Sequence, residues 1–157
     1  MKKVYGVILL AAALISGNAN AQCGQRYHDF IYQDSVVSNI KYGYNTKYNG
    51  GVDSLKLDIY FPKGDTETSR PLYIIAHCGN FLGGSKTGTD VVPFAKDLSR
   101  MGYVTSSINY RTGMTNFPFP GPDSTDAAES VMRAVHDAKA AVRFFRKSFE
   151  NGNPYGI

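Results

Sequence analysis

The chain has 157 residues, the size of one ordinary domain, and carries 17 Lys and Arg residues against 13 Asp and Glu residues. It contains no basic run of five or more residues, and its Tyr and Phe residues are not interleaved with Lys or Arg. This composition argues against a nucleic-acid partner, because such partners select basic patches with aromatic stacking residues. No pattern in the sequence requires a cofactor or a metal, and we predict neither.

The first 21 residues have the pattern of a signal peptide. Met1-Lys2-Lys3 is basic, Val7 to Ile15 is apolar, and Ala19-Asn20-Ala21 fits the small-x-small rule for cleavage before Gln22. A membrane-spanning helix needs about 20 apolar residues, roughly twice the length of this run, so we expect no stable membrane insertion. We expect export to the periplasm or the exterior, cleavage near Ala21/Gln22, and a folded domain over residues 22–157.

The two cysteines, Cys23 and Cys78, could form a disulfide in an oxidising compartment. The residues before Cys23 lack the leucine of a lipoprotein signal, which favours soluble export over lipidation. Cys78 lies in a glycine-containing turn, where a buried free thiol and a bridge fit the pattern equally well. The pairing of the two thiols therefore stays open.

Two segments in the first half alternate apolar and polar residues, Val36 to Lys41 and Leu55 to Phe61. This alternation predicts two antiparallel edge strands. Asn49-Gly50-Gly51 lies between them and supplies residues that tolerate positive φ, which predicts a hairpin. Pro62-Lys63-Gly64 is expected to end the second strand.

The pattern changes at Leu72 to Ala76, an unbroken apolar run that predicts a strand covered on both faces at the centre of a parallel sheet. Val91 to Met101 follows with helical spacing, and Gly102 stands where a helix C-cap belongs. Tyr103 to Ile108 is then a second buried strand. The three elements together predict a βαβ unit.

A loop and a long helix complete the chain. Phe117 to Asp123 contains three prolines and predicts an irregular surface loop bordering a substrate cleft. The helix is expected from Ser124 or Thr125 to Glu150, with Asn151-Gly152 as its stop. Its core-facing stripe is predicted to comprise Val131, Val135, Ala138, Val142 and Phe145. This stripe would be only partly covered, so we expect the chain to be the leading part of a larger domain, truncated at its C-terminus.

The segment after the first buried strand, His77-Cys78-Gly79-Asn80-Phe81, resembles the oxyanion segment of α/β-hydrolase esterases and lipases of the HGGG type. In that family two backbone N–H groups of the turn face the oxygen that becomes negative in the tetrahedral intermediate. The resemblance implies that the amides of Gly79 and Asn80 are the oxyanion donors and that His77 anchors the turn. Cys78 and Asn80 depart from the family's glycines.

The resemblance extends over nearly all of the mature chain. Leu55 to Pro62 looks like the family's second strand, Ile108 to Arg111 like the segment after its fourth strand, and Val135 to Phe145 with Tyr155-Gly156-Ile157 like the approach to the nucleophile. It implies the N-terminal half of an α/β-hydrolase fold, with antiparallel edge strands leading into a parallel sheet with flanking helices. It also implies structural roles for Arg111 and Asp137. From the residues alone, a solvated or capping carboxylate is the simpler interpretation of Asp137.

The family's nucleophile motif, G-x-S-x-G, does not occur in the sequence. The nearest match, Gly83 to Thr87, fails at its last position, and Ser85 is interpreted as a turn or cap residue. His28 and His136 have no partner pattern and are expected at the surface. The nucleophile, acid and base are therefore expected outside this chain, which alone would be inactive.

The sequence as a whole predicts the N-terminal part of an exported serine hydrolase of the carboxylesterase or lipase type. Its substrate would be an ester, either a small molecule or linked to a polymer, and lipid, plant cell-wall and peptide substrates all remain open. The alternative is a noncatalytic binding module that retains the hydrolase fold.

Overall fold

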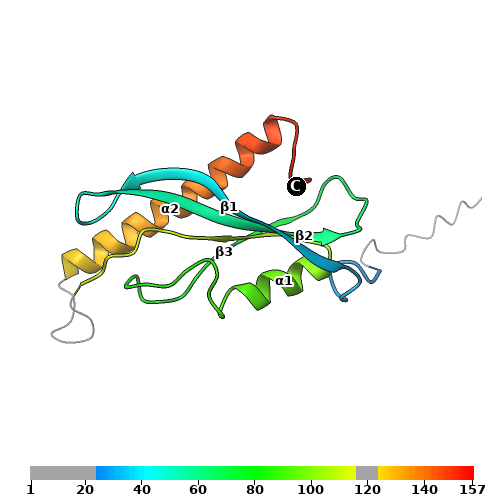
Figure 1. Cartoon of the computed structure of the whole chain (residues 1–157), viewed down its shortest axis with the longest axis horizontal. Coiled ribbons are helices and arrows are strands. Elements are labelled where there is room, and N and C mark those ends of the chain that lie inside the picture. The colour runs from blue at the N-terminus through cyan, green and yellow to red at the C-terminus, as the bar shows by residue number, and fades with distance from the viewer. Residues whose placement is uncertain (1–23, 116–123) are drawn as a thin grey trace, which may run out of the picture.

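The computed structural model describes residues 24–115 and 124–157. The predicted signal peptide, Cys23 and the proline-rich segment lie outside the described residues. Six elements follow in the order β1 (Gln33–Thr46), β2 (Val52–Lys63), β3 (Leu72–Ala76), α1 (Val92–Arg100), β4 (Val104–Ile108) and α2 (Ser124–Glu150). Figure 1 shows them in chain order. All six elements were predicted from the sequence, although β1 is considerably longer than the predicted segment.

The four strands form one mixed sheet in the order β1-β2-β4-β3. β1 and β2 are antiparallel, β2 and β4 are antiparallel, and β3 and β4 are parallel, which confirms the predicted βαβ unit. The predicted edge position of β2 is wrong, and the predicted central position of β3 is not seen within the described residues. β2 is an interior strand, because β4 pairs with its second edge, whereas β3 forms the edge of the described sheet and is partly exposed.

The connection between β1 and β2 is the predicted hairpin. The Lys47 N–H donates to the Gly51 carbonyl at 2.6 Å, and the Gly50 N–H donates to the Lys47 carbonyl at 3.1 Å. Two irregularities interrupt the β1–β2 register, between Val37 and Ile40 and between Lys41 and Gly43. Such bulges bend and twist an edge strand, which hinders its pairing with another chain.

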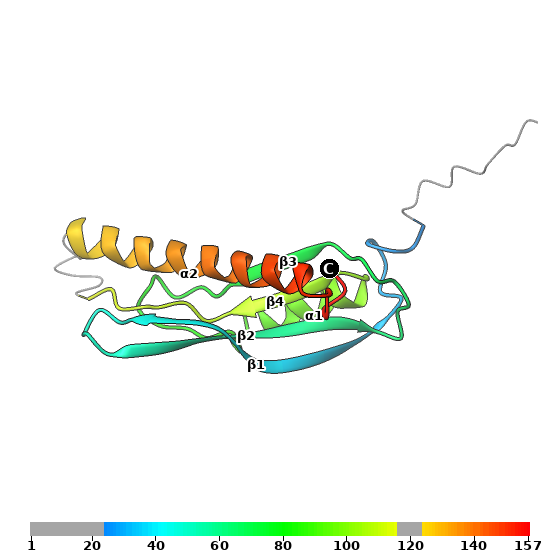
Figure 2. The ribbon, with the colours of Figure 1, turned by 90° about the horizontal axis from the view of Figure 1, so that it is seen from above.

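The two helices lie on opposite faces of the sheet (Figure 2). The face toward α2 holds the apolar core, which comprises Tyr42, Leu55, Leu57, Ile59, Val104 and Ile108 from the strands and their ends, with Ala141 and Phe145 from α2. The buried residues of α1 are Ala95, Leu98 and Ser99. Gly102 follows α1, and the Tyr103 N–H donates to the Leu98 carbonyl at 3.2 Å, which is the hydrogen bond of a Schellman cap.

The predicted core-facing stripe of α2 is only partly right. Phe145 is buried, but Val131, Val135 and Val142 are 39–41% exposed. The buried residues of this helix are Ser130, Asp137, Ala141 and Phe145, which recur at helical spacing. The partial exposure of the three valines agrees with the expectation that the stripe is only partly covered within this chain. Asp137 is buried beside it because it pairs with Arg111 from another segment.

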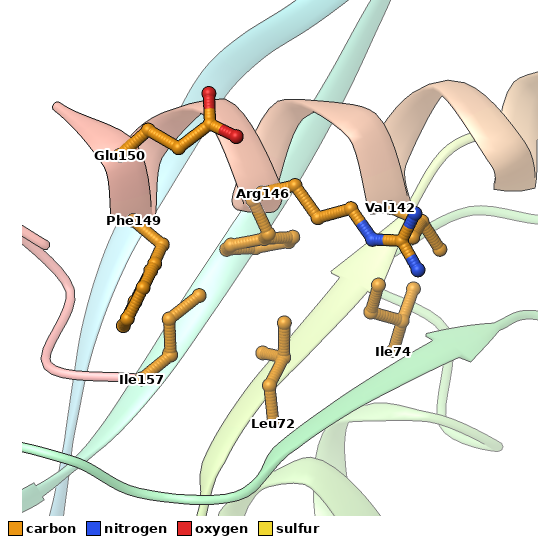
Figure 3. Close-up of a pocket in the computed structure, with 8 residues that line it drawn as sticks. Leu72, Ile74, Val142, Arg146, Phe149, Glu150 and Ile157 are labelled. Atoms are coloured by element: carbon orange, nitrogen blue, oxygen red, sulfur yellow. The ribbon is translucent and has the colours of Figure 1, made fainter.

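Three of the exposed apolar residues of α2, Val135, Val142 and Phe149, line the seam between this helix and β3. At the start of β3 lies a pocket of about 310 Å³, lined by Leu72, Ile74, Val142, Phe145, Arg146, Phe149, Glu150 and Ile157 (Figure 3). A second pocket of about 280 Å³ lies at the end of β3 and is lined by Ala76, His77, Phe81, Ile108, Tyr110, Ala134, Val135 and Ala138. The seam is thus apolar at both ends of the strand. Among residues 24–115 and 124–157, no helix is both long and apolar enough to cross a bilayer.

Candidate active site

A tight turn follows β3 directly. Gly79 has φ +130°, and Asn80 and Phe81 follow with φ values of +51° and +61°. A Cβ at Gly79 would lie 2.2 Å from the Gly83 carbonyl oxygen, so no side chain fits there. The Leu82 N–H donates back to the Gly79 carbonyl at 2.9 Å and closes the turn. Asn80 is well suited to its position, because Asn tolerates the left-handed conformation better than most residues.

His77 lies beneath this turn. It is 4% exposed, and its Nδ1 lies 2.7 Å from the Cys78 carbonyl oxygen. A carbonyl oxygen only accepts, so Nδ1 is the protonated nitrogen in this contact. The ring stacks on Tyr110 with centroids 4.3 Å apart, and the Tyr110 hydroxyl donates to the His77 carbonyl at 2.8 Å. A Cβ at Gly84 would lie 2.2 Å from His77 Nδ1. The backbone can therefore pass directly against the imidazole ring only because this residue is a glycine.

The amide of Cys78 is already occupied. Its N–H donates to Asp90 Oδ2 at 2.6 Å, and this hydrogen bond lowers the pKa of the Asp90 carboxyl. The Cys78 thiol is free and exposed, not buried as one of the two open alternatives had it. Cys78 is not among the residues with positive φ. A side chain in place of the family's glycine is therefore accommodated without backbone strain.

The next two amides are available. Gly79 and Asn80 are both exposed, and among the described residues no acceptor takes the N–H of either one. The Phe81 carbonyl accepts from Gly113 N–H at 2.7 Å and from Met114 N–H at 3.1 Å. These two hydrogen bonds hold the far side of the turn to the segment that follows β4. The structure therefore presents two consecutive backbone donors on a fixed turn at the end of a strand.

Lys86 and Ser85 lie after the turn. The Lys86 Nζ is 2.6 Å from Asp58 Oδ1 on β2, and both side chains are buried. Ser85 Oγ accepts the Thr87 N–H at 3.2 Å and lies 2.9 Å from the Thr87 hydroxyl. Ser85 is therefore a turn residue, as the sequence predicted.

Arg111 and Asp137 form a buried structural pair. Asp137 is fully buried, and its carboxylate accepts the Arg111 N–H at 2.8 Å, Nε at 2.9 Å and Nη2 at 2.8 Å. Arg111 Nη1 also donates to the Thr46 carbonyl at 2.7 Å. The interpretation of Asp137 as a solvated carboxylate is wrong, because this side chain ties α2 to the end of β4 and to the end of β1.

The remaining histidines lie apart from the turn. His28 pairs with its neighbour Asp29 at the surface, and His136 is exposed on α2. Over residues 24–115 and 124–157, no group of three or more His, Cys, Asp or Glu side chains is placed to hold a metal ion.

Three contacts of the turn were missed in the sequence: Asp90 on the Cys78 amide, Tyr110 on His77, and Asp58 on Lys86. Each joins residues 12 to 33 positions apart. The sequence marks Tyr110 only as part of the segment Ile108 to Arg111. No local spacing signal identifies such partners, because they meet only when the strands have paired.

Three solved structures with a similar fold are esterases. Brefeldin A esterase, a bacterial homologue of human hormone-sensitive lipase, is 18% identical over 76% of this chain and 29% of its own, with a TM-score of 0.51. Esterase 2 of Thermogutta terrifontis, phosphorylated by paraoxon, is 22% identical over 84% of this chain and 42% of its own, with a TM-score of 0.52. A truncated carbohydrate esterase from gut microbiota is 21% identical over 83% of this chain and 38% of its own, with a TM-score of 0.51.

The fold is therefore a partial α/β-hydrolase fold of the type found in esterases. The chain belongs to the BD-FAE family, whose model matches residues 57–155, more than half of the chain. It spans less than half of the length of each of the three esterases. Among curated proteins, the comparison finds no match.

Proposed function

We propose that the natural protein containing this chain is an exported serine carboxylesterase, in which the turn after β3 supplies two oxyanion donors. The observation that supports the proposal is the pair of exposed amides at Gly79 and Asn80, which no described residue uses. Backbone donors at such a position act on the charge that develops in the transition state, and losing one typically costs about 2.7–4 kcal/mol. His77 then serves as the buried anchor of the turn.

In the proposed reaction a serine outside the described residues attacks the ester carbonyl. Its hydroxyl proton passes to a histidine, the Oγ–C bond forms, and the carbonyl electron pair moves to the oxygen. The amides of Gly79 and Asn80 donate to this oxyanion, together with the N–H of the residue after the serine. The electron pair then returns to re-form the carbonyl, and the alcohol leaves with the proton held by the histidine. Water next attacks the acyl-serine through the same steps and releases the acid. His77 is assigned to holding the turn and not to proton transfer, because it is 4% exposed, stacks on Tyr110 and lies against the Cys78 carbonyl.

The seam between β3 and α2 supports the proposal that the nucleophile lies in a further part of the protein. Within the described residues β3 pairs only with β4, and apolar pockets lie beside both ends of the strand. The pocket at the end of β3 is bordered by His77 and Phe81, next to the proposed donors. We propose that the nucleophile-bearing part packs along this seam.

The test is hydrolysis of p-nitrophenyl acetate by the natural full-length protein, with paraoxon as the probe for a reactive serine. We expect hydrolysis that paraoxon stops. The 157-residue chain is expected to be inactive. Hydrolysis by this chain that survives Ser85→Ala would contradict the proposal that the nucleophile lies outside it. A full-length protein that neither hydrolyses the ester nor reacts with paraoxon would instead fit the noncatalytic binding module.

A further inference from the structure

A buried ion pair lies between the turn and the middle of the sheet. Lys86 is 5% exposed and Asp58 is 2% exposed, and Nζ and Oδ1 are 2.6 Å apart. Removing two charges from water carries a desolvation cost that is recovered only with good geometry and further hydrogen bonds. An apolar pair at these positions would provide burial without this cost. The ion pair is therefore a weak source of stability, and its presence here needs an explanation other than stability.

The hydrogen bonds around the pair connect four segments. Asp58 Oδ1 also accepts the Asn39 N–H at 2.7 Å, and Asn39 has φ +63° at the first irregularity of β1. The Lys86 N–H donates to Asn109 Oδ1 at 2.6 Å, just after the end of β4. The chain after the turn is thus fixed to β2 through the Lys86 ammonium group, and Asp58 in turn holds β1. The Lys86 amide fixes it to the end of β4.

We propose that Lys86 is a positioning residue for the oxyanion donors Gly79 and Asn80, an inference that rests on the proposed function. Lys86 follows Gly84 by two positions, and Gly84 lies against His77 Nδ1 and the Cys78 carbonyl. If Lys86 shifts, Gly84 shifts with it. Gly84 then moves relative to His77 and Cys78, the two residues that precede the donors. A charge-assisted hydrogen bond fixes distance and direction, whereas apolar contact is non-directional.

The decisive variant removes both charges, so that no unpaired charge remains buried. Lys86→Met with Asp58→Asn keeps an acceptor for the Asn39 N–H and retains the approximate volume of both side chains. In the full-length protein we expect kcat for p-nitrophenyl acetate to fall about 10- to 100-fold, since small misplacements of donors have effects of this size. We expect KM to stay within about twofold, because the donors act mainly on the transition state. Unchanged kcat in a folded double variant would overturn the proposal.

The control is a second ion pair far from the turn. Arg26 donates to Asp65 at 2.7 and 2.8 Å, and the Asp65 side chain is 2% exposed. Asp65 lies after β2, at the end of the sheet where β3 and β4 begin. Arg26→Met should lower the thermal midpoint and leave kcat unchanged below it. An equal loss of kcat in the control and in the double variant would assign the effect to general loosening and overturn the positioning role.

Amide hydrogen exchange distinguishes a failure of this inference from a failure of the proposed function. The double variant is expected to exchange at least about tenfold faster than wild type in peptides covering residues 77–88, where opening is local. If the wild-type protein is inactive but this exchange rises, the esterase proposal fails and Lys86 still positions the turn. If exchange in residues 77–88 is unchanged, the positioning role fails whatever the activity.

Discussion

The two faces of the sheet are built from different chemistry. Toward α2, the buried strand residues are mostly apolar, with Leu57, Ile59 and Val104 fully buried and Ser106 of β4 buried among them. On the opposite face, Asp58 from the neighbouring position of β2 is buried with Lys86. Apolar burial is non-directional and contributes most of the stability, whereas hydrogen-bonded charges fix the position of particular segments. The difference suggests that the α2 face holds the fold together and that the opposite face sets the geometry of the turn.

The largest expected effect is on the α2 face. Phe145→Ala removes a side chain that is 2% exposed in the core and should lower the free energy of unfolding by about 3–5 kcal/mol, the usual range for a buried Phe. Phe94→Ala is the matched control, because Phe94 is 54% exposed on α1. Urea denaturation measures both. Equal losses in the two variants would contradict the assignment of the core to the α2 face.

The next effect concerns the turn and should appear mainly in the rate. Gly79→Ala places a Cβ against the Gly83 carbonyl oxygen and forces a φ of +130° on a residue with a side chain. We expect kcat of the full-length protein to fall about 10²- to 10³-fold, as for the loss of one oxyanion donor. Gly83→Ala is the control, since a Cβ there meets nothing within 4 Å. Steady-state hydrolysis compares them, and similar kcat values would show that the turn has no part in catalysis.

Much of this fold was predictable because each element has a local signal. Alternation identified β1 and β2, the apolar run identified β3, and the helical spacing with Gly102 and Asn151-Gly152 gave the ends of α1 and α2. The order of the strands was not predictable, because β4 inserts between β2 and β3 without any local mark. The burial of Asp137 on α2 was not predictable for the same kind of reason: its partner is Arg111, 26 positions earlier in the chain.

The candidate site divides in the same way. The glycine-containing turn and its two donors were identified from the order of residues after a buried strand, since a turn is a local structure. The groups that hold the turn come from elsewhere: Asp90 binds the Cys78 amide, Tyr110 stacks on His77, and Asp58 pairs with Lys86. Their side chains are polar or aromatic and could equally have lain at the surface. Only the pairing of the strands brings them to the turn.

A smaller effect should appear in acid, away from both faces. Hydrogen bonds from Arg26 and Arg70 hold the pKa of the Asp65 carboxyl well below its usual value. A carboxyl with a depressed folded-state pKa contributes stability above its unfolded pKa of about 3.9 and loses that contribution as the pH falls below this value. Thermal midpoints of wild type and Asp65→Asn should therefore differ at pH 7 and converge in acid. Asp29→Asn is the control at an exposed position and should leave the thermal midpoint at pH 7 close to that of wild type.

The smallest effect is expected at Cys78. This effect distinguishes the contribution of the turn's backbone from that of its side chains. Cys78 does not have positive φ, its side chain is exposed, and its amide is held by Asp90 whatever the side chain. Cys78→Gly should therefore change both the free energy of unfolding and the activation free energy by at most about 0.5 kcal/mol, the usual limit for a surface position. The change in stability should be a loss, because glycine gives up more conformational entropy on folding. Thermal denaturation and kcat of the full-length protein test this. A large gain in kcat would mean that the side chain, and not only the backbone, limits how closely an oxyanion approaches Gly79 and Asn80.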